Sequence, residues 1–157
     1  MVELAAPEGG TYHPGQMTAG DGYTSSSRLP LVLVVEDDPQ TRRFYSEALT
    51  REGFAIDQAH NGHQAFAKAL ELNPDLVLTD IAVPGMDGIE LCRKLRADVR
   101  THAIPVLAIT GYGDRHYDDR ARVAGADQVL SKPCDVEVLV REARRLVRTQ
   151  AGRALAD

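Results

Sequence analysis

The sequence predicts an α/β protein in which five parallel strands form one doubly wound sheet with helices on both faces. Two observations lead to this fold class. Short apolar runs of strand length alternate with longer segments whose apolar residues recur at helical spacing. The apolar runs are nearly continuous, as in strands that are buried on both faces of a parallel sheet. Such strand–helix alternation favours parallel strands that are joined by crossover helices.

Each element has recognisable boundaries. The first strand is expected at residues 31–35, an unbroken aliphatic run that ends in acidic residues. Asp38 and Pro39 then form an N-cap and a first helical residue, so a helix is predicted over 39–52, ending before Gly53. The later elements are separated by similar turn signals. Further strands are expected at 54–59, 75–80, 104–109 and 128–130, and further helices at 62–72, 87–97, 114–124 and 135–148.

The N-terminal segment differs in composition from the rest of the chain. Residues 9–27 are rich in Gly, Ser, Thr and Pro and show no sustained hydrophobic period, so 1–28 is expected to be a flexible extension. The strand–helix units place a single domain at 29–148, and 149–157 is expected to be a short tail. A chain of 157 residues suits one domain with such extensions.

The composition is that of an ordinary soluble globular protein, with 43% hydrophobic and 26% charged residues. A formal net charge of −5 argues against a general nucleic-acid binder. Cys92 and Cys134 are expected to be reduced packing residues rather than a disulfide framework. No apolar run approaches the length of a membrane helix, and residues 1–10 do not resemble a secretory signal. A cytoplasmic location without membrane contact is therefore expected.

Polar residues follow the predicted strands at their carboxyl ends. Glu36 and Asp37 follow the first strand, Asp80 the third, Thr110 the fourth and Lys132 the fifth. Ligands of open α/β sheets bind outside the carboxyl ends of the strands, so these side chains are expected to converge on one rim. Crowded carboxylates repel strongly, and a hard divalent cation such as Mg²⁺ relieves that repulsion.

This residue set contains the parts that phosphoryl transfer requires. A carboxylate can act as the nucleophile and form an aspartyl phosphate. Lys132 and Thr110 would supply a cation and a hydroxyl for the phosphoryl oxygens. Each residue alone has an ordinary structural explanation, because acids after strands often cap helices, and Asp38 is expected to be mainly such a cap. Their joint occurrence at separate strand ends favours the functional interpretation.

The sequence resembles the receiver domain of two-component response regulators over roughly residues 29–148. The resemblance rests on several spaced motifs, at 34–39, 78–88, 109–111, 125–127 and 130–133. It implies a flavodoxin-like strand order of 2-1-3-4-5. It also implies that Asp80 is the phosphoacceptor. Mg²⁺ would then be bound by Asp37, Asp80 and the backbone carbonyl of Ala82, with Glu36 acting through water.

The resemblance further implies that Thr110 is the hydroxyl that moves toward the phosphate and that Lys132 binds the phosphate. Two positions depart from the family pattern. Family members commonly have Tyr or Phe where this chain has Val129, which leaves the aromatic part of the switch open, and Tyr112 could replace that part in some measure. Ala82 is small where many members have a polar side chain, which leaves space beside the phosphate. The access of water to the phosphate is therefore expected to be altered, although Tyr112 could cover this space.

The implied function is a phosphorylation-dependent signalling switch. A sensor histidine kinase or a histidine phosphotransfer protein would supply the phosphoryl group, and no enzymatic action on an external substrate is expected. Only one helix and a tail are predicted after Lys132, which is too little for a DNA-binding module. The expected output is therefore contact with a downstream protein, without direct DNA binding. A homodimer could form through the fourth helix, fifth strand and fifth helix of the domain.

Two alternatives remain. A receiver-like interaction scaffold could have kept the fold without phosphorylation control; Val129 is compatible with this, whereas the intact acidic set, Thr110 and Lys132 argue against it. An aspartate-nucleophile hydrolase would usually need a general acid two residues after the nucleophile, where Ala82 has no proton to give.

The last predicted helix carries a row of arginines on one face, formed by Arg141, Arg144, Arg145 and Arg148. The ordinary explanation is a solvated helix exterior. The alternative is a docking face for an acidic partner or a second copy of the chain.

Overall fold

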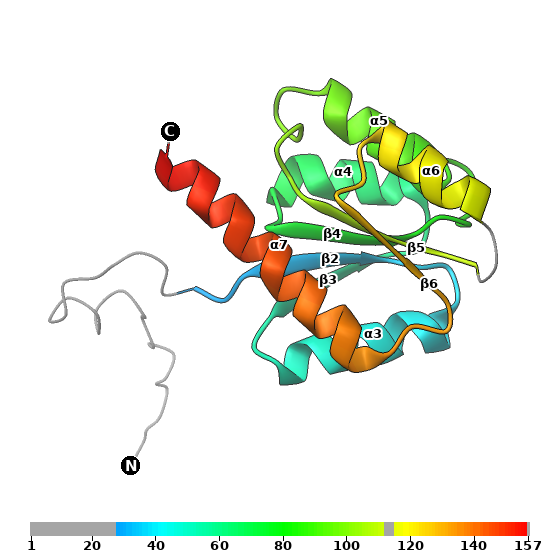
Figure 1. Cartoon of the computed structure of the whole chain (residues 1–157), viewed down its shortest axis with the longest axis horizontal. Coiled ribbons are helices and arrows are strands. Elements are labelled where there is room, and N and C mark those ends of the chain that lie inside the picture. The colour runs from blue at the N-terminus through cyan, green and yellow to red at the C-terminus, as the bar shows by residue number, and fades with distance from the viewer. Residues whose placement is uncertain (1–27, 112–114, 157) are drawn as a thin grey trace, which may run out of the picture.

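The computed structural model describes residues 28–111 and 115–156 of the chain. They form a five-stranded parallel sheet between two layers of helices (Figure 1). The strand order is β3-β2-β4-β5-β6, which in chain order is the predicted 2-1-3-4-5. The fold class and the strand order are therefore confirmed. The predicted extension 1–28, apart from Arg28, lies outside the described residues, as does Tyr112.

The boundaries of the elements follow the predicted turn signals closely. The strands are β2 (Leu31–Val35), β3 (Ala55–Ala59), β4 (Leu76–Asp80), β5 (Val106–Thr110) and β6 (Gln128–Ser131). The helices are α3 (Pro39–Arg51), α4 (Gly62–Leu72), α5 (Gly88–Ala97), α6 (Arg115–Ala124) and α7 (Val136–Ala156). None of these helices combines the length and the apolar character that crossing a membrane requires.

The end of α7 is the one boundary that differs substantially from its prediction. The helix was expected to end at Arg148, but it continues to Ala156, so most of the predicted tail 149–157 is helical. The prediction stopped where the hydrophobic pattern facing the domain fades. The residues that follow include no proline, and the Thr149 hydroxyl bonds back to the carbonyl of Arg145 at 2.8 Å, as in a continuing helix.

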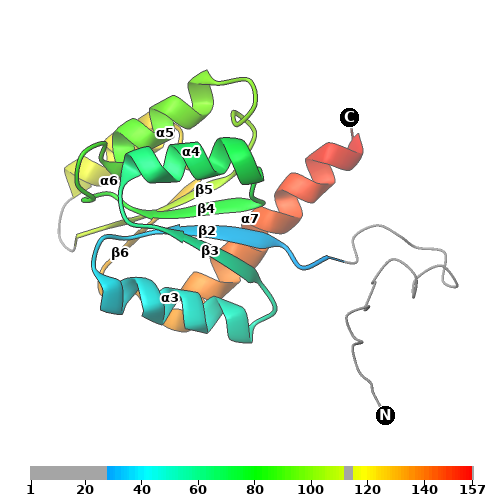
Figure 2. The ribbon, with the colours of Figure 1, turned by 180° about the vertical axis from the view of Figure 1, so that it is seen from behind.

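The sheet separates two hydrophobic clusters. Helices α4, α5 and α6 cover one face, and α3 and α7 cover the other (Figures 1 and 2). Alternate residues of β2 enter different clusters: Leu33 lies beneath α4 to α6, and Val34 lies beneath α3 and α7. This double burial explains why the central strands are continuous aliphatic runs. It also fixes the carboxyl ends of the strands as one rim.

In each outer strand of the sheet, side chains form hydrogen bonds with backbone groups on the edge that has no neighbouring strand. In β3, the amides and carbonyls of Ile56 and Gln58 face away from β2, because Ala55 and Ala59 bond to the β2 side. The Gln58 amide donates to Asp57 Oδ1 at 2.7 Å, and the Gln58 carbonyl accepts from Lys68 Nζ at 2.6 Å.

The same arrangement recurs on β6, at the other edge of the sheet, where the Val129 amide donates to Gln128 Oε1 at 2.9 Å. In both edge strands the side chain of one residue therefore caps the backbone of the next.

Candidate functional site

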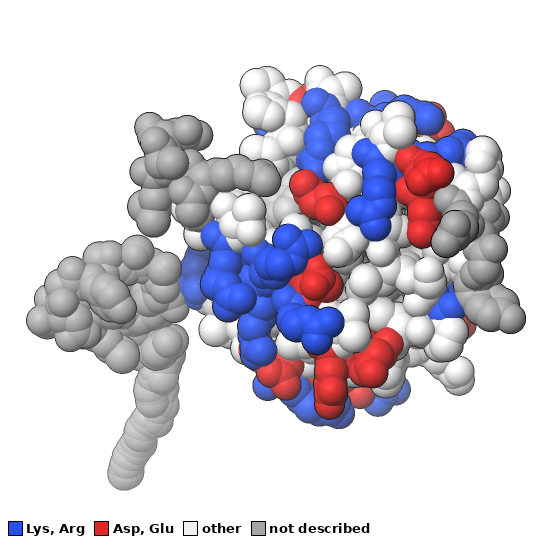
Figure 3. Space-filling view, in the orientation of Figure 1, with Lys and Arg blue, Asp and Glu red and all other residues white. Residues whose placement is uncertain are grey.

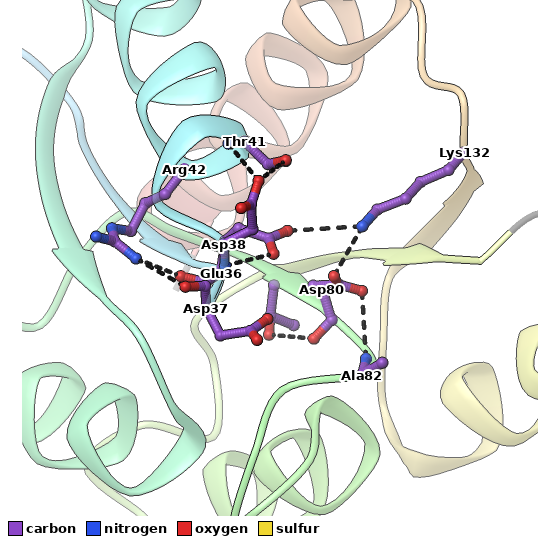
Figure 4. Close-up of polar contacts among 9 residues, drawn as sticks. Glu36, Asp37, Asp38, Thr41, Arg42, Asp80, Ala82 and Lys132 are labelled. Atoms are coloured by element: carbon purple, nitrogen blue, oxygen red, sulfur yellow. Dashed lines mark hydrogen bonds and ion pairs between the residues drawn. The ribbon is translucent and has the colours of Figure 1, made fainter.

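Three carboxylates meet at the carboxyl ends of β2 and β4, as the sequence predicted. Glu36 and Asp37 follow β2, and Asp80 ends β4 (Figure 4). One oxygen from each lies within 4.8 Å of the other two. We call these three residues the acidic site. Glu36 and Asp80 are buried, and Asp37 faces solvent, so the site is closed on one side and open on the other.

The carboxylate of Asp80 is held from two directions. Its Oδ2 atom accepts a hydrogen bond from Lys132 Nζ at 2.8 Å, and its Oδ1 atom accepts one from the Ala82 amide at 3.2 Å (Figure 4). The buried Thr79 hydroxyl donates to the Asp80 carbonyl at 2.9 Å. Asp80 itself is only 6% exposed. A buried carboxylate fixed in this way is pre-oriented toward the rim.

Glu36 is the carboxyl group of the site whose ionised form is most strongly disfavoured by burial. It is 2% exposed, and its Oε2 atom accepts from the Asp38 amide at 3.1 Å. Its Oε1 atom is buried and has no hydrogen-bond partner among the described residues, with Lys132 Nζ 3.7 Å away. Burial raises the pKa of Glu36 to about 7; the nearby charge of Asp80 also raises it, while the Asp38 amide and Lys132 oppose the shift.

Helix α3 positions the backbone that carries Glu36 and Asp37. The guanidinium of Arg42 donates to the Glu36 carbonyl at 2.8 Å and to the Asp37 carbonyl at 3.5 Å (Figure 4). Asp38 is the predicted N-cap, because its Oδ2 atom accepts from the Thr41 amide at 2.9 Å and from the Thr41 hydroxyl at 2.5 Å. The hydroxyl and the amide of Thr41 lower the pKa of Asp38.

Lys132 brings the positive charge that the sequence placed at the end of the fifth strand. Burial alone would lower its pKa, but the hydrogen bond and charge of Asp80, together with the charge of Glu36, raise the pKa overall. Lys132 therefore stays protonated at neutral pH. It lies 2.8 Å from Asp80 and 3.7 Å from Glu36, so it bridges the two buried carboxylates.

The residues of the site fit a divalent cation. When all are ionised, three carboxylates and one ammonium leave two negative charges without a partner, which matches the charge of one Mg²⁺. The buried Oε1 atom of Glu36 accepts no hydrogen bond among the described residues, and the nearby Lys132 Nζ, at 3.7 Å, is beyond hydrogen-bond distance, so this oxygen can still take a ligand. Oxygen ligands and an opening to solvent are what Mg²⁺ requires, since it usually keeps several waters.

Thr110 lies at the predicted rim but does not contact the acidic site. It ends β5, where Asp80 pairs with the preceding residue, Ile109. The Thr110 side chain is 1% exposed, and its hydroxyl lies 3.1 Å from the Gly111 carbonyl and 3.4 Å from Asp118 Oδ1. No hydrogen bond among the described residues joins Thr110 to Asp80.

The position of Val129 bears on the predicted switch. Its side chain is buried in the cluster beneath α4 to α6, together with Ala108 of β5 and Ala121 of α6. An aliphatic side chain therefore fills the space on the α6 side of β6. Ala82 is exposed at the rim beside Asp80, and the metal role of its carbonyl stays a prediction.

Sequence reasoning missed two residues that touch this site. Arg42 was assigned no role, although it lies four residues after the N-cap Asp38 and so one helical turn above the strand end. Asp118 was missed because its approach to Thr110 depends on how α6 lies against the sheet. The spacing of Arg42 from Asp38 was visible in the sequence, whereas no local sequence signal pointed to Asp118.

The predicted row of arginines lies on the surface of α7, where basic side chains gather (Figure 3). Some of its charge is neutralised within the chain. Arg144 pairs with Glu52 at 2.7 Å, and Arg145 pairs with Glu142 at 2.8 Å. This pairing favours the ordinary explanation of a solvated helix exterior.

Comparisons with known proteins agree with this geometry. Residues 32–144 match the family model described as the response regulator receiver domain. The chain belongs to this family. The receiver-domain resemblance that the sequence motifs indicated is therefore confirmed.

Curated relatives of this receiver domain are response regulators. The chain is 38% identical over 120 residues to the DNA-binding dual master transcriptional regulator RpaA of Synechocystis sp., covering 76% of this chain and 50% of RpaA. It is 39% identical over 117 residues to the transcriptional regulatory protein ResD of Bacillus subtilis, covering 74% of this chain and 48% of ResD. The chain thus spans about half the length of these relatives.

Solved receiver structures share the architecture. A putative response regulator from Chloroflexus aurantiacus superposes with a TM-score of 0.75 at 27% identity, covering 77% of this chain and 99% of that one. The signal receiver domain of a histidine kinase from Syntrophus aciditrophicus gives a TM-score of 0.71 at 33% identity, covering 76% and 91%.

Proposed function

We propose that this receiver domain is a phosphorylation-dependent signalling switch in which Asp80 accepts a phosphoryl group. The donor would be the phosphohistidine of a sensor histidine kinase or of a histidine phosphotransfer protein. The observation that carries the proposal is the Lys132 ammonium, 2.8 Å from Asp80 Oδ2, beside two further carboxylates of the acidic site. This arrangement combines a nucleophile with a fixed donor for phosphoryl oxygens.

The proposed cofactor is Mg²⁺, held by Asp37, Asp80 and the Ala82 carbonyl, with Glu36 acting through water. When bound, the ion would neutralise charge on the carboxylates and on the incoming phosphoryl group. The buried Oε1 atom of Glu36, which accepts no hydrogen bond from the described part of the chain, supports this role.

The chemistry of the chain's own residues follows from their positions. A carboxylate oxygen of Asp80 forms the new O–P bond as the P–N bond of the phosphohistidine breaks, and the electron pair of that bond stays on the leaving imidazole. Lys132 can follow from the carboxylate to a phosphoryl oxygen, because it reaches Asp80 through a flexible stem. The Thr110 hydroxyl would donate to another phosphoryl oxygen after a change of its hydrogen-bond partner.

The proposed output is contact with a downstream protein in the cytoplasm, without an external substrate. The net charge of −5 disfavours direct contact with DNA, whose phosphates attract basic surfaces. DNA binding by RpaA belongs to a protein about twice as long as the matched region. A homodimer through α6, β6 and α7 is one form that the contact could take.

A direct test is phosphorylation by a small donor. Incubation with Mg²⁺ and acetyl phosphate is expected to add one phosphoryl group, detected by intact mass. Asp80→Asn keeps the shape of the side chain but removes the nucleophile, so the adduct should be lost; EDTA should also abolish it. Asp119→Asn, an equivalent change at an exposed position on α6, should label normally.

The scaffold alternative predicts a different result. The proposed function would be contradicted if no adduct formed under conditions in which another receiver domain labels well. This result would favour a receiver-like interaction scaffold, with which Val129 is compatible. Labelling that survives Asp80→Asn would show that the acceptor has been assigned wrongly.

Binding of Mg²⁺ should be coupled to loss of a proton. The pKa of Glu36 is raised to about 7 in the metal-free fold, so this carboxyl is protonated at lower pH and ionises as the pH rises. We expect the affinity for Mg²⁺ to increase about tenfold between roughly pH 6 and pH 8, measured by titration calorimetry. In Glu36→Gln, which has no carboxyl group at this position, the affinity for Mg²⁺ should depend less on pH. Equal affinities of the unaltered protein at both pH values would contradict the coupling.

A further inference from the structure

A hydrogen bond joins the switch hydroxyl to α6. The Thr110 side chain is buried at the end of β5, and its Oγ1 atom lies 3.1 Å from the Gly111 carbonyl and 3.4 Å from Asp118 Oδ1, so both oxygens are acceptors within reach of the hydroxyl. Asp118 lies in the first turn of α6. Its neighbours at 116, 117, 119 and 120 are exposed, whereas Asp118 is half-buried and turned toward the sheet. The carboxylate thus reaches from the helix to the strand end beside Asp80.

Helix α6 is packed lightly against the domain. Its two buried side chains among the described residues, Ala121 and Ala124, are small and lie in its second half. Val123 is 87% exposed. Because the helix buries so little apolar area, a shift of its first half costs little free energy. The polar contact of Asp118 therefore matters more for the position of this half than it would in a deeply packed helix.

The Thr110 hydroxyl has a single proton and can donate to one acceptor at a time. A phosphoryl group carries close to two negative charges and three acceptor oxygens, so it competes strongly with a carboxylate for that proton. A hydroxyl that turns to a phosphoryl group at Asp80 must leave Asp118. Donation to a phosphoryl oxygen therefore excludes donation to Asp118 and to the Gly111 carbonyl.

We infer that Asp118 is a positioning residue of the switch: it holds the Thr110 hydroxyl toward α6 in the unphosphorylated chain and releases it when Asp80 is phosphorylated. This inference rests on the proposed function of Asp80. It gives the chain a polar route from β5 to α6. Such a route is useful here because Val129 is an aliphatic residue in the same buried cluster as Ala121, with no ring to turn.

Two consequences follow from this mutual exclusion. Removing the carboxylate leaves the neutral Gly111 carbonyl, 3.1 Å away, as the remaining acceptor of the Thr110 hydroxyl, and a phosphoryl oxygen displaces a neutral acceptor more readily than a charged one. Asp118→Ala should therefore raise the rate of labelling by acetyl phosphate about fivefold, the equivalent of one ordinary hydrogen bond. Asp118→Asn keeps an acceptor oxygen without the charge and should give an intermediate rate. The backbone amides of the first half of α6 should exchange faster with solvent in Asp118→Ala than in the unaltered protein.

The deciding experiment is a double-mutant cycle that combines Asp118→Ala with Thr110→Ala. Two quantities are measured for each variant: the hydrogen-exchange rates of the α6 amides and the rate of labelling by acetyl phosphate. Asp118→Ala should have no further effect on either quantity once the Thr110 hydroxyl is gone, because the two residues act through one contact. Asp119→Ala removes an equivalent charge from an exposed position and should change neither.

The inference is overturned if Asp118→Ala leaves α6 exchange and labelling at their original values, or if its effects persist in the Thr110→Ala background. Failure of the proposed function would look different. The unaltered protein would form no adduct, which would overturn the switching role as well, whereas the exchange cycle needs no phosphorylation and would still show whether the Thr110–Asp118 contact holds α6.

Discussion

A Lys132→Ala variant will acquire phosphoryl groups from acetyl phosphate about 100-fold more slowly than the unaltered protein, the usual effect of removing one preorganised donor from a reacting oxygen. The reason is geometric. Lys132 Nζ lies 2.8 Å from the Asp80 carboxylate, where the phosphoryl oxygens must arrive. The measurement is the initial rate of appearance of the adduct by intact mass, with Mg²⁺ in excess.

The same variant should be less stable in the absence of Mg²⁺. Loss of Lys132 leaves the buried carboxylates of Glu36 and Asp80 without a cation, because no other cation pairs with them among the described residues. Since Lys132 is partly exposed, we expect a loss of about 2 kcal/mol in the free energy of unfolding at neutral pH, less than for a fully buried pair. Added Mg²⁺ should restore most of this loss.

Lys94→Ala is the matched control, because it removes the same type of charge from an exposed position on α5. It should label at the original rate. Lys132→Arg, which keeps the charge but changes its geometry, should recover stability better than rate. A Lys132→Ala protein that labels at the original rate would remove the central support for the proposed role of this residue.

Gly88→Ala will destabilise the domain by about 3 kcal/mol, a typical result of overpacking a closed site. A Cβ atom at Gly88 would lie 2.6 Å from the Asp80 carbonyl oxygen and 2.7 Å from Ile81 Cα. Both are backbone atoms, so no flexible side chain can move aside. The Gly88 amide also donates to the Ile81 carbonyl at 2.8 Å, which closes the loop that begins at Asp80.

Thermal unfolding followed by circular dichroism should show a decrease in Tm of about 10 °C for Gly88→Ala, given the size of the domain. Labelling at Asp80 should slow in the same variant, because the loop must move to admit the methyl group. Gly111→Ala is the control, since a Cβ atom there would meet nothing within 4 Å. Similar Tm values for the two variants would show that the loop after Asp80 is more adaptable than this packing indicates.

The architecture could be predicted from sequence because the strands are buried on both faces. Leu31–Val35 and Leu76–Asp80 are continuous apolar runs, and such runs can hardly be anything but central strands when helical segments separate them. The acidic site could be predicted for a related reason. Parallel strands end at one rim, so residues that follow neighbouring strands such as β2 and β4 are brought close together, whereas Thr110 at the end of β5 shares the rim without contacting the acidic site.

Other properties of the site depend on packing that no local pattern encodes. The sequence does not indicate that Glu36 is buried, with one oxygen that accepts no hydrogen bond within residues 28–111 and 115–156, while the adjacent Asp37 faces solvent. Both follow the same strand, so the strand pattern alone does not distinguish them. The contact between Thr110 and Asp118 likewise depends on the placement of α6, which is set by small buried alanines rather than by a strong hydrophobic pattern.

Side chains occupy part of each edge of the sheet, and this affects how copies of the protein can meet. A strand arriving beside β3 would find the Gln58 amide and carbonyl already engaged by Asp57 and Lys68, and one arriving beside β6 would find the Val129 amide engaged by Gln128. Open sheet edges are the usual seeds of fibrillar aggregation. At these positions an incoming strand could pair only after displacing a hydrogen bond that already exists, which disfavours strand addition there.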